Sequence, residues 1–547
     1  MRNVMYLQYT GKRKAVKRKA VLSGFAGCLS GLGLCILETS CFFMGIFMKC
    51  KAMMLTAVAG LGIAACSAPV VKHENTQPLD FAGQKHVDKT MQVGGQAIRY
   101  RAFENIVYVK NPVDAAYQTL NIYIPEAYFN GGSINGYTAQ TAPIFLPNSI
   151  GGYMPAKAGV PGQGGFGHRK AGQIDAMQAA LARGYVVASP GARGRTAATG
   201  KAPAAIVDLK AAVRYLRFND AVMAGDAEKI ISNGTSAGGA LSVLLGATGN
   251  QADYEPYLQQ LGAAPAKDHI FAVSAYCPIS ILDHADAAYE WQFNGVNDYQ
   301  KIDASMLDYH AERKLINGTL TKEQIQISGH LKAQFPAYVN SLNLRDPQGR
   351  LLRLNAQGSG SFKNYVASFL RRSAQGQLDA GKDLSDRNWL TVRNGKVRAV
   401  NFAAYARATG RQKTPPAFDA LDLSSGENQL FGAAAIDKQH FTAFSYQHRS
   451  NPQATLADPH TVQLMNPMPF IGSHTSPQHW RIRVGTADSD TSLAIAAILA
   501  AKLQNSGKRV DFALPWDVPH SGDYDLDELF DWIDQAVKNQ NLTKQEM

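Results

Sequence analysis

Residues 231–246 have the sequence ISNGTSAGGALSVLLG, and this stretch decides the fold class. It contains the pattern G-x-S-x-G, with Ser236 between Gly234 and Gly238. A run typical of a β-strand precedes the serine, and a helix-forming run follows it. In a sharp strand-to-helix turn the serine backbone is strained, its hydroxyl is exposed, and the glycines leave room for the turn. The pattern favours Ser236 as a nucleophile, with an ordinary glycine-rich turn as the competing interpretation.

Short apolar runs alternate with helical patterns on both sides of this turn. The predicted strands are residues 105–109, 120–124, 144–146, 185–188, 230–232, 270–274, 481–484 and 510–514. The predicted helices are residues 175–183, 205–218, 492–505 and 526–538. This order is typical of βαβ units, so we predict an α/β fold with a mainly parallel sheet.

One long segment breaks the alternation. Residues 281–469 are richer in polar, irregular sequence such as RDPQGR at 345–350. We predict that this segment is a large inserted cap, or lid, with helices near 305–314 and 324–334. The core then has two parts, which are residues 86–280 and 470–547.

A serine nucleophile needs a general base, and the base needs an acidic partner that fixes its tautomer. Asp488 lies in GTADSD at 485–490, and His520 lies in WDVPHSGD at 516–523. Both follow predicted strands, so both are expected at the carboxyl edge of the sheet, where such folds hold their sites. Asp490 is the alternative acid, because it lies only two residues further on.

Acyl transfer also needs two N–H donors for the developing oxyanion. One is expected from Ala237, directly after the serine. The loop PNSIGGY at 147–153 follows another predicted strand, and its glycines allow a close backbone approach. We predict Gly151 as the second donor, although an ordinary Gly-Gly loop would have the same sequence.

Composition excludes several other classes of protein. The 547 residues are 46% hydrophobic and 18% charged, which excludes intrinsic disorder. The sequence lacks paired CxxC motifs, a phosphate loop ending in GK[ST] and a GxGxxG fingerprint. We therefore predict neither a metal ion nor a cofactor. Cys277 is the single cysteine after residue 66, and we predict it to be a small buried residue.

The net charge of +12 is unevenly distributed along the chain. Nine of the 55 Lys and Arg residues, but only one of the 43 acidic residues, fall within residues 1–51. A nucleic-acid-binding protein would carry its basic surface on the folded domain. This charge instead precedes an apolar stretch, so it indicates targeting and excludes nucleic acid as the expected partner.

The leader has the architecture of a secretory signal. Residues 48–65 combine a short basic start with an apolar run and small residues before Cys66. The sequence IAAC at 63–66 is similar to a bacterial lipobox, so we predict lipidation of Cys66 and a lipid anchor in a bacterial membrane. A membrane-spanning anchor at 21–48 and a cleaved ordinary signal, giving a periplasmic or secreted protein, are the alternatives. Residues 1–47 are interpreted as an upstream extension, and residues 66–85 as a tether.

Three longer segments of the body resemble the bacterial tannases, which are α/β-hydrolases that cleave galloyl esters. They are GTSAGG at 234–239, GTADSDTS at 485–492 and PWDVPHSGDYDLDELFDW at 515–532. The resemblance implies an α/β-hydrolase fold from about residue 90 onward. It also implies that Ser236, Asp488 and His520 form a catalytic triad, with Ala237 in the oxyanion hole.

The same resemblance implies a galloyl-binding set of Lys413 in RQKTPPAFD, Glu427 in SGENQLFG, and Asp490. A galloyl ring presents three adjacent hydroxyl groups, which carboxylates can accept from and an ammonium can donate to. The implied activity is a serine carboxylic-ester hydrolase that cleaves galloyl ester and depside bonds of small galloyl esters and hydrolysable tannins. Alternatives are a feruloyl esterase, a serine peptidase of the prolyl oligopeptidase type, and a polyphenol-binding protein with an inactive triad.

Overall fold

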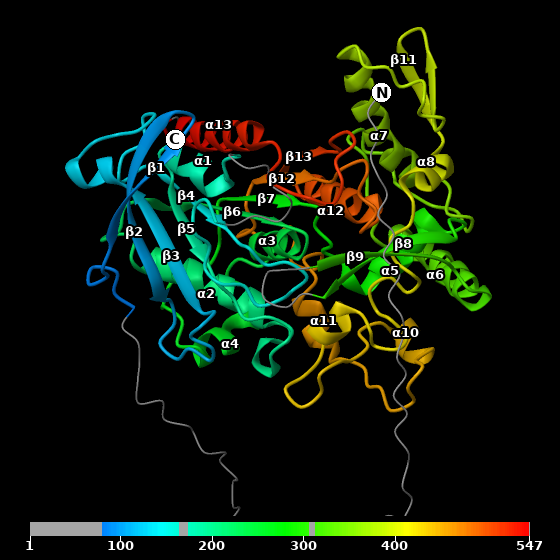
Figure 1. The fold of residues 1–547 in the computed structure, drawn as a ribbon, viewed down its shortest axis with the longest axis horizontal. Coiled ribbons are helices and arrows are strands. Elements are labelled where there is room, and N and C mark those ends of the chain that lie inside the picture. Colours follow the sequence, from blue (N-terminus) through cyan, green and yellow to red (C-terminus); the bar gives the residue numbers. More distant parts are fainter. Residues whose placement is uncertain (1–78, 164–172, 306–311, 546–547) are drawn as a thin grey trace, which may run out of the picture. The chain divides into compact units, whose positions relative to one another are not determined.

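The computed structural model describes residues 79–163, 173–305 and 312–545. Its main feature is a sheet with the strand order β1-β2-β3-β5-β4-β6-β7-β12-β13 (Figure 1). Neighbours from β5 to β13 are parallel, whereas β1, β2 and β3 pair antiparallel, which confirms the predicted mainly parallel sheet. The strands are β1 (Val87–Val93), β2 (Gln96–Val107), β3 (Thr119–Pro125), β4 (Pro143–Pro147), β5 (Val186–Pro190), β6 (Asp226–Thr235), β7 (Ala272–Tyr276), β12 (His479–Arg483) and β13 (Arg509–Ala513).

Helices cover both faces of the sheet. Side chains along a strand alternate between the two faces, so each strand contributes to two cores. In β4, Ile144 and Leu146 join the core on one face, and Phe145 joins the core on the other. The first face packs on α2 (Ala204–Phe218), α3 (Ala237–Ala247) and α12 (Leu493–Asn505). The second face packs on α1 (Ala176–Ala182) and α13 (Leu526–Gln545).

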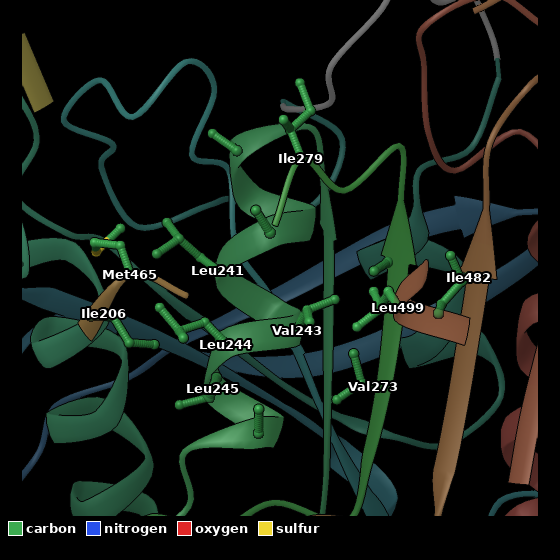
Figure 2. Close-up of a cluster of buried hydrophobic side chains, with 14 of the residues drawn as sticks. Ile206, Leu241, Val243, Leu244, Leu245, Val273, Ile279, Met465, Ile482 and Leu499 are labelled. Atoms are coloured by element: carbon green, nitrogen blue, oxygen red, sulfur yellow. The ribbon is translucent and has the colours of Figure 1, made fainter. Parts of the chain in front are cut away.

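Helix α3 is buried along its whole length. Figure 2 shows Leu244 directed toward Ile206 of α2, and Val243 directed toward Val273 of β7. Burying an aliphatic side chain of this size contributes roughly 1.5–3 kcal/mol of folding free energy. Packing on both sides therefore holds the helix that begins directly after Ser236.

A long segment separates β7 from β12, although these two strands are parallel neighbours in the sheet. It contains two antiparallel hairpins, β8 (Asp298–Ser305) with β9 (Glu312–Thr319) and β10 (Leu390–Arg393) with β11 (Lys396–Val400). Its helices are α5 (Leu282–Phe293), α6 (Lys322–Ser341), α7 (Ser361–Asp379), α8 (Phe402–Thr409), α9 (Gly426–Leu430), α10 (Ala443–Gln447) and α11 (Pro459–Leu464). The short elements elsewhere are η1 (Glu126–Asn130), η2 (Ala198–Gly200), η3 (Ala252–Tyr254) and α4 (Glu255–Gln260).

The boundaries of a cap, 281–469, stay a prediction, because the described residues fall in one compact unit. The helix predicted at 305–314 is wrong at both of its described ends, and residues 306–311 lie outside the described residues. Ser305 ends β8 and Glu312–Lys314 begin β9, with Asp298 opposite Thr319. Pairing with a neighbouring strand stabilises extended backbone here, where the local pattern had favoured a helix. The helix predicted at 324–334 lies inside α6.

The predicted tether is wrong at its C-terminal end. Leu79 and Phe81 are each 5% exposed. Asn219 holds both residues, because its side chain accepts from the Phe81 N–H and donates to the Leu79 carbonyl, each at 2.9 Å. The predicted signal, Cys66 and the rest of the leader lie outside the described residues. Within the described ranges no helix is long and apolar enough to cross a membrane.

Candidate active site

Ser236 occupies the turn between β6 and α3 as the sequence predicted. Its backbone has φ 58° and ψ −123°, a left-handed φ that residues other than glycine seldom adopt. The Ser236 N–H donates to the Tyr276 carbonyl at 2.9 Å, and its own carbonyl accepts from the Ala240 N–H at 2.9 Å. Strand β7 and helix α3 thus hold the strained residue from both sides, and strain of this kind concentrates at functional sites.

The loop 147–153 and Ala237, where the oxyanion donors are predicted, both lie at the first turn of α3. Ala237 is the first residue of this helix, where an N–H has no acceptor within the helix itself. The loop 147–153 packs against the same turn, because the Asn148 side-chain amide donates to the Gly238 carbonyl at 3.1 Å. The role of Gly151 as the second donor stays a prediction. Asn148 is a contributor that sequence reasoning missed.

His520 and Asp488 are hydrogen-bonded to each other. The His520 Nδ1 and the Asp488 Oδ2 are 2.9 Å apart, and the Asp488 side chain is fully buried. Its second oxygen accepts from the Asp490 N–H at 2.9 Å. These distances favour Asp488 over Asp490 as the acid that orients the imidazole.

The loop that carries His520 contacts β6, the strand that precedes Ser236. The Asn233 side chain of β6 donates to Asp523 Oδ1 at 2.9 Å. Gly522 lies directly against Thr235, so a Cβ at position 522 would overlap the threonine side chain. The structure therefore brings His520 to the edge of the sheet where Ser236 lies.

Cys277 is fully buried as predicted, but its neighbours were not foreseen. One ligand atom each from Cys277, Asp488 and His520 lie within 4.8 Å of one another. Burial, reinforced by the nearby negative charge of Asp488, raises the pKa of the Cys277 thiol to about 11. The thiol is thus protonated at neutral pH and packs beside the imidazole.

Asp490 joins the candidate triad to Lys413. Its Oδ2 lies 3.1 Å from the Lys413 Nζ and 3.7 Å from the His520 Nε2. Burial opposes the charged carboxylate, but Lys413 and His520 together lower the pKa of Asp490. For His520, burial opposes the charged imidazolium, yet Asp488 and Asp490 together raise its pKa well above its usual value.

Glu427 lies in the first turn of α9, near Lys413. Burial raises the pKa of Glu427, and the negative charge of Asp490 raises it further. The positive charges of Lys413 and Arg195 lower it, but burial prevails. Arg195 also connects two parts of the site, because it donates to the Gly152 carbonyl at 2.7 Å and to Gln429 Oε1 at 2.6 Å. No sequence signal pointed to Arg195, since its partners are distant in the chain.

Solved structures similar to this chain include tannases. The Fusobacterium nucleatum tannase is 53% identical, with a TM-score of 0.81 over 84% of this chain and 99% of its own. The Lactobacillus plantarum tannase is 47% identical, with a TM-score of 0.80 over 84% of this chain and 100% of its own. The chain belongs to the bacterial tannase family. A tannin acyl hydrolase in complex with ethyl gallate is 48% identical to this tannase, with a TM-score of 0.76 over 82% of the chain and 97% of its own.

A family model is consistent with this family. The BD-FAE family model matches residues 143–320 of this tannase, and BD-FAE is a domain of the α/β-hydrolase type. No curated protein matches the chain. The protein is a carboxylic-ester hydrolase with the α/β-hydrolase fold, as the sequence segments implied.

Proposed function

We propose that this tannase hydrolyses galloyl ester and depside bonds and releases gallic acid through an acyl-enzyme on Ser236. The observation that carries the proposal is the position of Asp490, 3.1 Å from the Lys413 Nζ and 3.7 Å from the His520 Nε2. Polar groups suited to ring hydroxyls therefore adjoin the candidate general base. The similar tannin acyl hydrolase in complex with ethyl gallate supports a ligand of this kind.

In the first half of the reaction, Ser236 Oγ attacks the ester carbonyl carbon while His520 Nε2 takes the hydroxyl proton. Asp488 accepts the hydrogen bond from His520 Nδ1 and stabilises the imidazolium. The negative charge develops on the former carbonyl oxygen. The N–H groups of Ala237 and Gly151 would stabilise that oxyanion, a contribution worth about 3 kcal/mol per donor.

In the second half, His520 returns the proton to the leaving alcohol oxygen as the ester C–O bond breaks. Water then attacks the galloyl-Ser236 carbonyl while His520 accepts one of its protons. Transfer of this proton to Ser236 Oγ releases gallic acid and regenerates the enzyme. His520 takes part in all of these proton transfers.

Recognition of the acyl group is assigned to Lys413, Glu427 and Asp490. The ammonium of Lys413 donates to a hydroxyl oxygen of the ring, and the two carboxylates accept from hydroxyl groups. A site built for hydroxyl groups disfavours a ring that lacks them by up to about 10⁵-fold, because its own polar groups would stay unpaired. Small galloyl esters and hydrolysable tannins are the proposed substrates.

A substrate panel tests this proposal. Purified wild-type protein and Ser236→Ala would be compared on methyl gallate, methyl ferulate and a proline-containing peptide. We expect turnover of methyl gallate by the wild type, with a loss of at least about 10⁴-fold in the variant. Faster turnover of methyl ferulate or of the peptide would contradict the galloyl assignment, and full activity of Ser236→Ala would contradict the nucleophile.

We also propose that the protein is anchored in the bacterial cell envelope through a lipid on Cys66. The support is the signal-like sequence at 48–65 and the lipobox-like IAAC at 63–66, all outside the described residues. Cells that express the full chain would be labelled with radioactive palmitate. Label on the wild type and none on Cys66→Ser is expected, and an unlabelled wild type would contradict the anchor.

A further inference from the structure

One buried hydroxyl joins two segments that meet at the candidate galloyl site. Tyr289 of α5 accepts hydrogen bonds from the N–H groups of Gln412 at 2.9 Å and Lys413 at 3.0 Å. The same hydroxyl donates to the Ser489 carbonyl at 2.9 Å. A tyrosine hydroxyl has one proton to donate and can accept two, so these three bonds use its full capacity.

The two joined segments carry the side chains assigned to ring recognition. Ser489 lies between Asp488 and Asp490 in the chain, and Asp490 is the partner of Lys413 at 3.1 Å. A second, weaker connection runs from the Ser489 hydroxyl to Gln412 Oε1 at 3.4 Å. The distance between Lys413 and Asp490 therefore depends on the junction that the Tyr289 hydroxyl makes between their backbones.

The tyrosine ring is itself held rigidly. Tyr289 is fully buried, with its ring centroid 4.6 Å from that of Phe293. The guanidinium of Arg411 lies 5.6 Å from the same ring centroid and pairs with the buried carboxylate of Glu290. Burial also raises the pKa of Tyr289, so its hydroxyl keeps the proton that it donates. Rigid packing of this kind lets one hydroxyl fix the distance between two loops.

We propose that Tyr289 is a positioning residue that sets the selectivity of this enzyme for galloyl esters. It acts through the backbone of Lys413 and of Ser489, and it keeps the Lys413 ammonium and the Asp490 carboxylate at the spacing of the ring hydroxyls. This inference rests on the proposed function, because it assigns a cause to the selectivity that the function requires. No motif identified Tyr289, which lies 124 residues from Lys413 and 200 from Ser489.

Removal of the hydroxyl has a specific consequence at this junction. Tyr289→Phe keeps the ring but leaves two N–H groups and one carbonyl without their partner, and buried polar groups without partners are costly. The two segments are then expected to separate or to admit water. A displacement of about 1 Å is enough to cost up to about 100-fold in a catalytic rate. The loss should fall most heavily on substrates that use both segments.

The test compares two esters in the full-length protein. For wild type and Tyr289→Phe, kcat/KM would be measured with methyl gallate and with p-nitrophenyl acetate, whose acyl group has no ring. The value for methyl gallate divided by the value for p-nitrophenyl acetate is expected to fall about tenfold in Tyr289→Phe, chiefly through a higher KM for methyl gallate. The matched control is Tyr254→Phe, which removes another fully buried hydroxyl, hydrogen-bonded to the Leu464 carbonyl at 2.6 Å. Its ratio should equal that of the wild type.

The alternative outcomes are distinct. If both activities of Tyr289→Phe fall by the same factor, Tyr289 supports only the fold and the inference is overturned. If Tyr289→Phe does not fold, Gln412→Ala weakens the same junction at a half-buried residue, and an unchanged ratio there overturns the inference too. Absence of methyl gallate turnover in the wild type would instead remove the proposed function itself.

Discussion

Asp490 is the residue where the proposed galloyl-binding set adjoins the proposed catalytic residues. It pairs with Lys413, and it lies 3.7 Å from His520 Nε2, the nitrogen proposed to accept the Ser236 proton. Its charge is among those that raise the pKa of His520. The base works only when neutral, so kcat/KM should increase with pH as His520 loses its proton.

Substitution of Asp490 should therefore move the pH profile. Asp490→Asn removes one negative charge near His520, so the pKa of His520 falls and the rising limb of kcat/KM moves to lower pH. The prediction is checked with p-nitrophenyl acetate, because Asp490→Asn should also weaken methyl gallate turnover, by roughly 10- to 100-fold. Lys382→Gln, at an exposed site, is a charge-changing control. A limb that stays in place or moves to higher pH would contradict the electrostatic role.

At this scale the sequence predicted the residues whose order along the chain is informative. Ser236, Asp488 and His520 follow the parallel strands β6, β12 and β13, and parallel strands end at one edge of a sheet. Cys277, Arg195 and Tyr289 could not be predicted in this way. Each contacts the site through partners far away in the chain, and none belongs to a local pattern.

The turn from β6 into α3 is the element on which the site is built. Its backbone approaches the loop after β4 so closely that position 238 has no room for a side chain. A Cβ on Gly238 would lie 2.8 Å from the Ile150 carbonyl and would overlap the Asn148 side chain. The position of the loop that is predicted to hold the second oxyanion donor therefore requires glycine at position 238.

Gly238→Ala should therefore displace that loop. We expect kcat to fall by about 10²-fold, as for the loss of an oxyanion donor, and stability to fall by about 1–3 kcal/mol through overpacking. Kinetics with methyl gallate and urea unfolding measure the two effects. Gly376→Ala, at an exposed position of α7 with nothing near the added Cβ, is the matched control and should stabilise the protein by about 0.5–1 kcal/mol. Equal behaviour of the two variants would contradict this account.

The strands and helices around the turn were predictable because burial on both faces makes their patterns strong. The segment between β7 and β12 was predicted less well. The helix predicted at 324–334 lies inside α6, but the described ends of another predicted helix belong to the strands β8 and β9. Strand β1 was also missed, because its burial pattern alternates only weakly and it gains its partner from the neighbouring β2. Pairing between strands in such segments depends on context more than on local propensity.

In the molecule as a whole, residues just ahead of the sheet belong to the folded body. Leu79 and Phe81 join the main core, and Asn219 at the end of α2 holds their backbone. The sequence around them is polar and contains Pro78, so composition favoured a tether. The contacts that order these two residues come from α2, about 140 residues later in the chain.

A shortened chain tests this attachment. A protein that begins at Lys85 should be less stable than one that begins at Ser67 by about 3–5 kcal/mol, because two large apolar side chains lose their burial. The free energy of unfolding in urea measures the difference. Leu79→Ala in the longer protein should give part of the same loss, at about 2–4 kcal/mol. Equal stability of the two proteins would show that the segment contributes nothing.

The central claim is that Ser236 carries the galloyl group during turnover. Wild-type protein and Ser236→Ala would be mixed with methyl gallate, quenched in acid within milliseconds, digested and analysed by mass spectrometry. The account predicts a galloyl adduct on the peptide that contains Ser236, present in the wild type and absent in Ser236→Ala. An adduct on another residue, or methyl gallate hydrolysis by Ser236→Ala at the wild-type rate, would contradict it.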